Sequence, residues 1–321
     1  MIKHLPKIIF TVLLFAAMVL PRFNGNQSIV RQQSYDSKYF KTYVEYFRGE
    51  VLTAPLRPAT NWRFGVPLLA SYLPFDALTS INTVNLFFLA LGIVIFFKTL
   101  HLMQVDINKR WYAIWIFICS FPTFYYSSIA YVDASLFFFI ALSIYAAITN
   151  QLALFYTAIL VGFCVKETIV IGLPFYFIYH YKKVERKLII QFVPLFVLLL
   201  IEAYLIRHYA PVSAGDLHNK NWFWHSSLVS VKNNFTRFNT WFSMIASFGI
   251  PFVLYAIYNV QLIKRKLPFN SLQKACAASI IIAIGLYTFS YISTIADGRM
   301  IWTCYMYFLI SWLDNTKQQV V

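Results

Sequence analysis

Residues 131–147 read YVDASLFFFIALSIYAA, a run in which nearly every side chain after Asp133 is apolar. A helix that crosses a bilayer needs roughly 17–25 mostly apolar residues, so this stretch predicts a membrane-spanning helix that begins at an acidic residue. The whole chain agrees, because 60% of its 321 residues are hydrophobic, 12% are charged and the mean hydropathy is +0.62. Soluble domains are about 45–50% apolar and about 25% charged, so the composition excludes a soluble protein.

Similar apolar runs recur along the chain, and we expect about ten of them to span the membrane. The expected spans are Ile8–Leu20, Ile81–Phe97, Trp111–Ser127, Asp133–Ile148, Leu152–Val165, Thr168–Tyr181, Leu188–Ile206, Trp241–Val260, Cys276–Ile295 and Met300–Leu313. No small-x-small cleavage site comes after the first run, which favours an uncleaved anchor over a signal peptide. The expected fold class is an all-α polytopic membrane protein, with residues 1–321 in a single membrane domain.

The net charge of +15 reports first on orientation. Lys and Arg accumulate in the cytoplasmic loops of membrane proteins. Placing the N-terminus inside puts the runs KKVERK (182–187) and KRK (264–266) on the inner side and makes basic residues denser there. We therefore expect both termini to be cytoplasmic, and we expect no nucleic-acid partner.

Two long loops then lie outside, residues 21–79 and residues 207–240. In the first, the segment SYDSKYFKTYVEYFRGE (34–50) places tyrosines at three- and four-residue spacing. This predicts an amphipathic helix whose aromatic face lies at the membrane interface. The next apolar stretch, FGVPLLASYLPF (64–75), is too short to span and is broken by Pro67, so we expect it to be re-entrant or interfacial.

Ionisable residues at the ends of the expected spans gather on the outer side. Such residues are costly near hydrocarbon and usually face a cavity or a partner. Most of the acidic residues fall on this side, which predicts a polar chamber at the outer face. The candidate site residues are Asp36, Arg57, Arg63, Asp133, Lys166, Glu167, Asp297 and Arg299.

Each candidate also has a purely structural interpretation. Asp36 and Asp133 would be N-caps of their own helices, since Asp is among the best caps. The neighbours in Lys166-Glu167 would neutralise each other at a hairpin tip. The acid and base of the turn ADGR (296–299) would form a surface ion pair of small energetic value, and the first-loop arginines would be solvated.

At these residues the chain resembles the GT-C superfamily of multi-pass glycosyltransferases, which use sugars linked to polyprenyl phosphate or diphosphate. The resemblance covers about residues 8–180, with its motifs in order and on one side. The segments that carry it are YDSKYFKTYVEYFRGE with Asp36, NWRFGVPLLASYL with its Arg-x-x-x-Pro-x-Leu-Ala pattern, YVDASLFFFIALSIYAA with Asp133, and VKETIVIGLPF with Lys166-Glu167-Thr168.

The resemblance implies a glycosyltransferase at the outer face of a bacterial inner membrane, with a lipid-linked sugar donor and a glycan or lipid acceptor. Sugar transfer needs a general base for the acceptor hydroxyl, and Asp36 is the candidate. It also needs cations beside the leaving phosphate, for which Arg57, Arg63, Lys166 and Arg299 are the candidates. The family implies inversion at the anomeric carbon.

The sequence departs from the family in its first outer loop, because members commonly carry an acidic pair there and here Asp36 has no neighbouring acid. A divalent metal is thus left open as a cofactor, and we predict no metal-ligating residues, since the histidines of the second outer loop lack compact ligand spacing. Three alternatives stay open. They are a surface-polysaccharide polymerase or ligase, a transporter or flippase for a lipid-linked substrate, and a structural membrane subunit.

Overall fold

Helices make up the regular secondary structure of this protein wherever its fold is described. The computed structural model describes residues 4–33, 35–54, 56, 63–180, 186–209, 227–293 and 298–314, and no β-strand occurs among them. The elements are α1 (Leu5–Gln33), α2 (Tyr35–Arg48), α4 (Gly65–Ser71), α5 (Ala77–Leu102), α6 (Ile107–Ile118), α7 (Phe121–Tyr126), α8 (Asp133–Ile148), α9 (Leu152–Val165), η2 (Glu167–Ile171), α10 (Gly172–Tyr179), α11 (Arg186–Tyr209), α13 (Ser227–Thr236), α14 (Phe238–Lys264), α15 (Ser271–Ser293), α16 (Arg299–Trp302) and α17 (Tyr305–Asp314).

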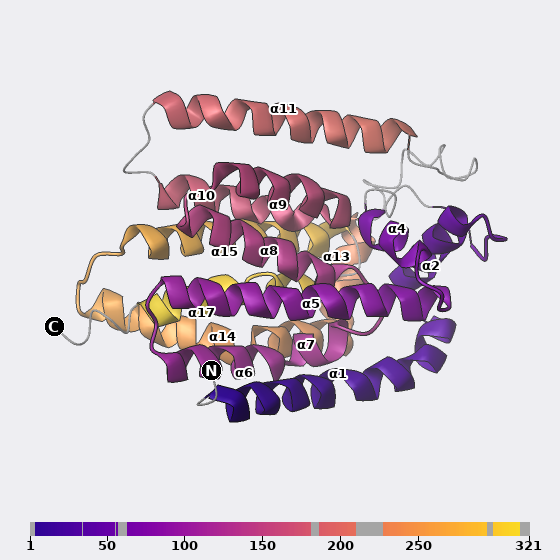
Figure 1. The fold of residues 1–321 in the computed structure, drawn as a ribbon, viewed down its shortest axis with the longest axis horizontal. Helices are drawn as coiled ribbons and strands as arrows, with labels where there is room; N and C mark the ends of the chain where they lie inside the picture. Colours follow the sequence, from indigo (N-terminus) through magenta and orange to yellow (C-terminus); the bar gives the residue numbers. More distant parts are fainter. Residues whose placement is uncertain are drawn as a thin grey trace.

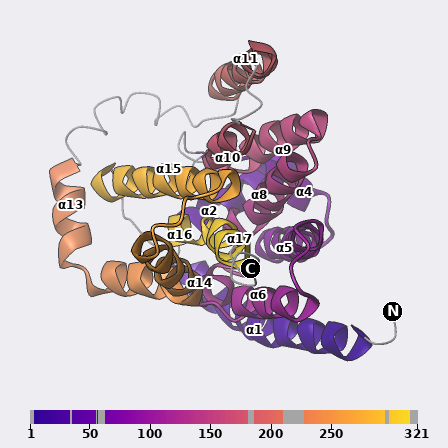
Figure 2. The same cartoon turned by 90° about the vertical axis from the view of Figure 1, so that its left-hand side faces the viewer.

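The longer helices lie side by side along the long axis of the molecule (Figure 1). Helix α8 is near the centre, where it packs against α5 and α9, while α15 packs against α10 and α17. Figure 2 shows the bundle end-on, with α1, α11 and α13 at its periphery. The core is apolar and aromatic, and Phe137, Trp302 and Tyr305 are among its fully buried side chains.

Three helices, α5, α14 and α15, are long and apolar enough to cross a membrane. Five shorter apolar segments lie among the remaining helices. They are Leu5–Pro21, Asp133–Ile148, Leu152–Val165, Glu167–Tyr179 and Ile190–Ile206. The structure therefore supports an all-α membrane protein, but it does not support the predicted count of about ten spans.

The difference arises because several predicted spans are interrupted. The run 111–127 is divided between α6 and α7 at Ser120, whose hydroxyl caps α7 by accepting the N–H of Thr123 at 3.3 Å. Helix α6 has 12 residues and rises only about 18 Å, against a hydrocarbon core of about 30 Å. The run 300–313 is likewise divided, between the four-residue α16 and the ten-residue α17.

Helix α2 confirms the amphipathic helix predicted in residues 34–50, and protein buries part of its aromatic face. Phe40, Tyr43 and Val44 are buried, and the helix packs against α4 and α5. Protein therefore covers the centre of the aromatic stripe, at Phe40 and Tyr43. Tyr46 alone among these tyrosines counts as an exposed large side chain in the described part of the helix.

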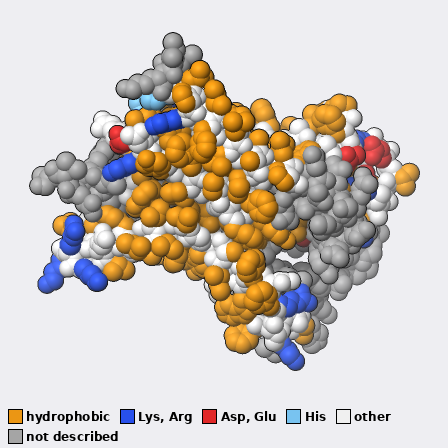
Figure 3. Space-filling view, turned by 90° about the horizontal axis from the view of Figure 1, so that it is seen from below, with side chains coloured by type: hydrophobic (Ala, Val, Ile, Leu, Met, Phe, Trp, Pro, Cys, Tyr) orange, Lys and Arg blue, Asp and Glu red, His pale blue; other side chains and the backbone are white. Residues whose placement is uncertain are grey.

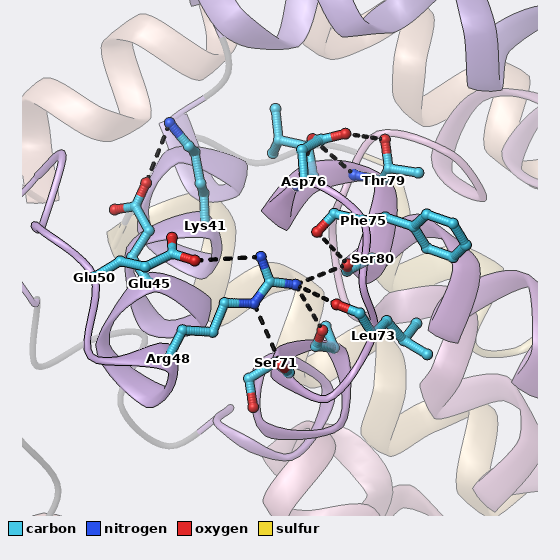
Figure 4. Close-up of polar contacts among 12 residues, drawn as sticks. Lys41, Glu45, Arg48, Glu50, Ser71, Leu73, Phe75, Asp76, Thr79 and Ser80 are labelled. Carbon is cyan, nitrogen blue, oxygen red and sulfur yellow. Dashed lines mark hydrogen bonds and ion pairs between the residues drawn. The ribbon is translucent and has the colours of Figure 1, made fainter.

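Arg48, at the end of α2, fastens this helix to the next segment (Figure 4). Its Nη2 donates to the carbonyl of Leu73 at 2.7 Å and to Ser80 Oγ at 3.1 Å, and its Nε donates to the carbonyl of Ser71 at 3.2 Å. The two carbonyls lie at and just beyond the end of α4, and Ser80 lies in the first turn of α5. Helix α4 is a short helix within the stretch predicted to be re-entrant or interfacial, and it buries Val66, Pro67 and Ala70. Part of the first long loop, namely α2 and α4, is therefore folded and packs against the bundle.

Hydrophobic side chains cover the middle of the surface in Figure 3. Lys and Arg lie at the left-hand end in that view and also at the lower right, and a group of Asp and Glu lies at the right-hand end. A broad apolar surface between two polar ends is the pattern of a protein embedded in a bilayer. Of the predicted second outer loop, residues 210–226 lie outside the described residues.

Candidate functional site

Four charged residues from distant parts of the chain meet at one end of the bundle. Arg299 Nη1 lies 2.9 Å from Asp36 Oδ2 and 3.8 Å from Asp133 Oδ2, and the ammonium group of Lys166 donates to Asp133 Oδ1. We call these four residues the Arg299 network. They come from α2, the start of α8, the end of α9 and the start of α16, so the network ties four helices together.

Local backbone structure directs each side chain to this place. Asp133 lies in the first turn of α8, whose N-cap is Val132, and so Asp133 does not cap its own helix. Lys166 ends α9 in an extended conformation, with φ −163° and ψ 130°, which turns the chain at the hairpin tip. The capping interpretation therefore fails for Asp133, and its carboxylate is committed to Lys166 and Arg299 instead.

Glycine at position 298 brings Arg299 to the network. The Gly298 N–H donates to Ser243 Oγ at 2.8 Å, so the start of α16 rests directly on α14. A Cβ added at Gly298 would overlap both Ser247 Oγ and the carbonyl oxygen of Ser243. No larger residue fits there without moving α14 or α16, so the glycine sets the position of the guanidinium.

Arg63 and Glu167 form a second ion pair beside the network. Arg63 Nη2 lies 2.6 Å from Glu167 Oε1, and its Nε lies 3.0 Å from Oε2, which is a bidentate arrangement. Burial acts to lower the pKa of Arg63, but the carboxylates of Glu167, Asp36 and Asp133 raise it above its ordinary value. The Arg63–Glu167 pair and the Arg299 network therefore form one electrostatic unit.

This unit also decides between the remaining structural interpretations. Lys166 and Glu167 each form an ion pair with a different residue, so they do not simply neutralise each other. Arg63 is held against Glu167 rather than solvated. Arg57 and Asp297, the other two predicted site residues, lie outside the described residues.

Exposure of the charged side chains increases from the bottom of the Arg299 network to its rim and to the neighbouring Glu167. The side chains of Asp133 and Lys166 are 1% and 4% exposed, whereas those of Asp36 and Glu167 are 30% and 39% exposed. A buried ion pair must keep both partners, because removing one leaves an uncompensated charge. Asp133 and Lys166 therefore shape the site from below, and the rim residues are the ones that a ligand can reach.

Asp36 is ionised at neutral pH. Burial acts to raise its pKa, but Arg299, together with Arg63 and Lys166, lowers the pKa below the ordinary value of 3.8. A carboxylate held in this way accepts hydrogen bonds but is a weak base as long as Arg299 remains its partner.

The turn before Asp133 is shaped by residues that were not predicted from the sequence. Tyr131 lies under Arg299, with the guanidinium carbon 4.2 Å from the ring centroid. The turn is held by α5, where Asn82 Oδ1 accepts the N–H of Ala130 at 2.7 Å and Asn85 Nδ2 donates to the Tyr131 carbonyl. Two asparagines three residues apart inside an apolar span were the available signal, since such residues face other helices or a cavity.

Among the residues that the structure describes, no group of three or more His, Cys, Asp or Glu side chains is placed to hold a metal ion. The charged groups of the described site are the carboxylates of Asp and Glu and the cationic side chains of Lys and Arg. No protein-family model, curated protein or solved structure matches the chain. Function must therefore be inferred from the geometry of the site.

Proposed function

We propose that this protein is a membrane glycosyltransferase, which moves a sugar from a polyprenyl-phosphate or polyprenyl-diphosphate donor to an acceptor hydroxyl. The observation that carries the proposal is the contact between Arg299 and Asp36. A guanidinium suited to phosphate and a carboxylate suited to a hydroxyl proton lie 2.9 Å apart on an accessible rim. Glycosyl transfer from a phosphate needs both groups in one site, the carboxylate at the acceptor hydroxyl and the cation at the leaving phosphate.

Donor binding is the first step. The phosphate engages Arg299 and Arg63, whose planar groups bind two oxygens at once. Arg299 then shares its charge with the phosphate, and the pKa of Asp36 rises toward its ordinary value. The resting ion pair thus keeps the base weak until the donor is in place.

Transfer occurs next, at the anomeric carbon. Asp36 accepts the proton of the acceptor hydroxyl, and the hydroxyl oxygen forms a bond to the anomeric carbon. The bond from that carbon to the phosphate oxygen breaks, and its electron pair stays on the phosphate. Arg299 and Arg63 stabilise the charge that grows on this leaving group, which is where fixed cations are most effective.

We further propose that the site end of the bundle faces away from the cytoplasm of a bacterial inner membrane, with both termini cytoplasmic. At the other end of the molecule Lys and Arg lie with few acidic residues among them in Figure 3, as expected for a cytoplasmic side. The five shorter apolar segments would then lie in the membrane beside α5, α14 and α15, which gives at most eight crossing segments among the described residues.

One observation favours a second candidate, a transporter for a lipid-linked substrate. Helix α14 is interrupted at Gly249, where φ is +52° and ψ is −167°, two residues before Pro251. Tyr305 donates its hydroxyl hydrogen to the Ser247 carbonyl at 2.7 Å, next to the break. Discontinuous helices at mid-membrane depth are a feature of transporters.

A reconstituted assay separates the two candidates. The purified protein, in lipid nanodiscs, is incubated with radiolabelled sugars on polyprenyl phosphate and on polyprenyl diphosphate, together with glycan and lipid acceptors. A transferase moves label to an acceptor in nanodiscs, where no compartment exists. If the label stays on the carrier lipid, and the protein moves that lipid across the membrane of sealed liposomes, the protein is a transporter and the transferase proposal is wrong.

A further inference from the structure

An apolar groove runs along the outside of the bundle at the end opposite the Arg299 network. It lies between α1, α5 and α6 and has a volume of about 950 Å³. Its lining side chains come from residues 4–15, from residues 90–101 of α5 and from residues 107–118 of α6, and most of them are apolar.

The groove exists because α1 is fastened to α6 rather than to α5. Lys7 Nζ donates to Asn108 Oδ1 at 2.6 Å, and Trp115 Nε1 donates to Thr11 Oγ1 at 2.9 Å. The rings of Phe10 and Trp115 also meet edge to face at 5.0 Å. Helix α1 thereby forms one wall, and α5 forms the other.

The polar lining residues share one end of the groove. Helices α1 and α6 begin, and α5 ends, at the same side of the molecule (Figure 1). At that side, His4, Lys98, His101 and Arg110 line the groove, whereas Phe15, Ala90 and Ile118 line its other end. The groove therefore has a cationic mouth and an apolar interior.

Contacts with neighbouring residues hold Arg110 in place at the mouth of the groove. Arg110 Nη1 donates to His101 Nδ1 at 3.0 Å, and its Nε donates to the carbonyl of Val105 at 2.7 Å. Its guanidinium carbon also lies 5.7 Å from the centre of the Phe97 ring. These contacts fix a cation at the groove entrance, and Lys98, one turn back from His101, adds a second charge.

The depth of the groove matches one leaflet of a bilayer. On α1 the lining extends from residue 4 to residue 15, and on α5 from residue 90 to residue 101, a rise of about 16 Å in each case. Half of a hydrocarbon core is about 15 Å. An acyl chain entering from the mouth would end near the bilayer midplane.

We propose that this groove binds one anionic phospholipid of the leaflet on the basic side of the protein, with its phosphate at Lys98 and Arg110 and an acyl chain along Val94 and Ile8. Charge complementarity selects an anionic headgroup, and the leaflet-deep apolar walls select a lipid rather than a soluble phosphate. The site is separate from the Arg299 network and does not depend on the proposed function.

Native mass spectrometry of the delipidated full-length protein tests the site, with dioleoylphosphatidylglycerol as the probe. Diacylglycerol with the same chains and inorganic phosphate test the tail and the headgroup alone. We expect one tightly bound phosphatidylglycerol, with both partial probes binding more weakly. Lys98→Gln should weaken phosphatidylglycerol binding about fivefold, as expected for one basic residue near an anionic lipid.

The matched control is Lys109→Gln, which removes the same charge from the same end of the bundle but outside the groove lining. A second variant, Val94→Trp, fills the groove at an exposed position and should prevent tight binding without disturbing the core. Equal loss for Lys98→Gln and Lys109→Gln would overturn the proposal, because it would reduce the effect to general surface charge. Unchanged binding to Val94→Trp, or equal binding of diacylglycerol, would also overturn it.

Discussion

Arg299 and Asp36 are 263 positions apart in the chain, yet Nη1 of the arginine lies 2.9 Å from Oδ2 of the aspartate. The contact joins α2, the helix of the first long loop, to the start of α16. It also places a cation for phosphate next to a carboxylate for a hydroxyl proton, which is the relationship on which the proposed function depends.

Arg299→Lys keeps the charge but loses the planar group that binds two phosphate oxygens. We expect the KM for the lipid-linked donor to rise about tenfold, since a charge-assisted hydrogen bond contributes about 1.5–3 kcal/mol and lysine keeps part of it. Steady-state kinetics measure the change, with Arg237→Lys as the control at an exposed position outside the network. An unchanged KM would show that Arg299 does not hold the phosphate.

The Asp36 ion pair should make stability depend on pH. Because the folded-state pKa of Asp36 lies below 3.8, the pair stabilises the fold above that pH and the contribution is lost as pH falls through the folded pKa. We expect the free energy of unfolding at pH 7 to be about 1 kcal/mol larger for wild type than for Asp36→Asn. The difference is small because the ion pair is partly exposed. Thermal melting in detergent should show the difference shrinking below about pH 4. A constant difference across this range would contradict the pairing.

Gly298→Ala should damage the site through packing alone. The added methyl group would overlap Ser247 Oγ, and overpacking typically costs about 1–3 kcal/mol. We expect a lower melting temperature and a loss of transfer activity as Arg299 is displaced. Gly285→Ala is the control, because a Cβ there meets nothing within 4 Å, and it should leave the protein as stable or more so. Similar melting temperatures for both variants would contradict the close contact between α16 and α14.

Membrane orientation has a direct test. Single cysteines are placed at Glu50 and at Lys266, both exposed, in a background without the four native cysteines. An impermeant maleimide added to intact cells should label position 50 but not position 266. The reverse pattern would place the Arg299 network on the cytoplasmic side and would contradict a site that meets its donor at the outer face.

The sequence predicts the fold class and the membership of the site better than it predicts the packing. Composition alone indicates a helical membrane protein, and the alternation of apolar runs places Asp36, Asp133 and Arg299 on one side. Which carboxylate meets which cation cannot be read from these patterns, because it depends on contacts such as that of Gly298 with α14. Hydropathy also overcounts spans, since it does not register the helix start that Ser120 creates inside an apolar run.

The burial of α2 could not be predicted from the sequence, for a related reason. A stripe of aromatic residues suits a lipid interface and a protein core equally well, so Phe40 and Tyr43 do not indicate which of the two they meet. Arg48 docks α2 on the bundle by donating to backbone carbonyls at the end of α4. Such acceptors cannot be recognised from the pattern of side chains in the sequence. Asn82 and Asn85, in contrast, were visible as polar residues in an apolar run.

The most direct measurement of the central claim is the transfer rate of Asp36→Asn with a lipid-linked sugar donor, alongside Glu50→Gln. The control makes the same carboxylate-to-amide change at an exposed position of the same loop, outside the network. Loss of a general base lowers a rate by about 10²–10⁴-fold. We predict a loss of this size for Asp36→Asn, with the variant folded and membrane-inserted, and an unchanged rate for Glu50→Gln. Transfer by Asp36→Asn at the wild-type rate would contradict the claim that Asp36 is the base.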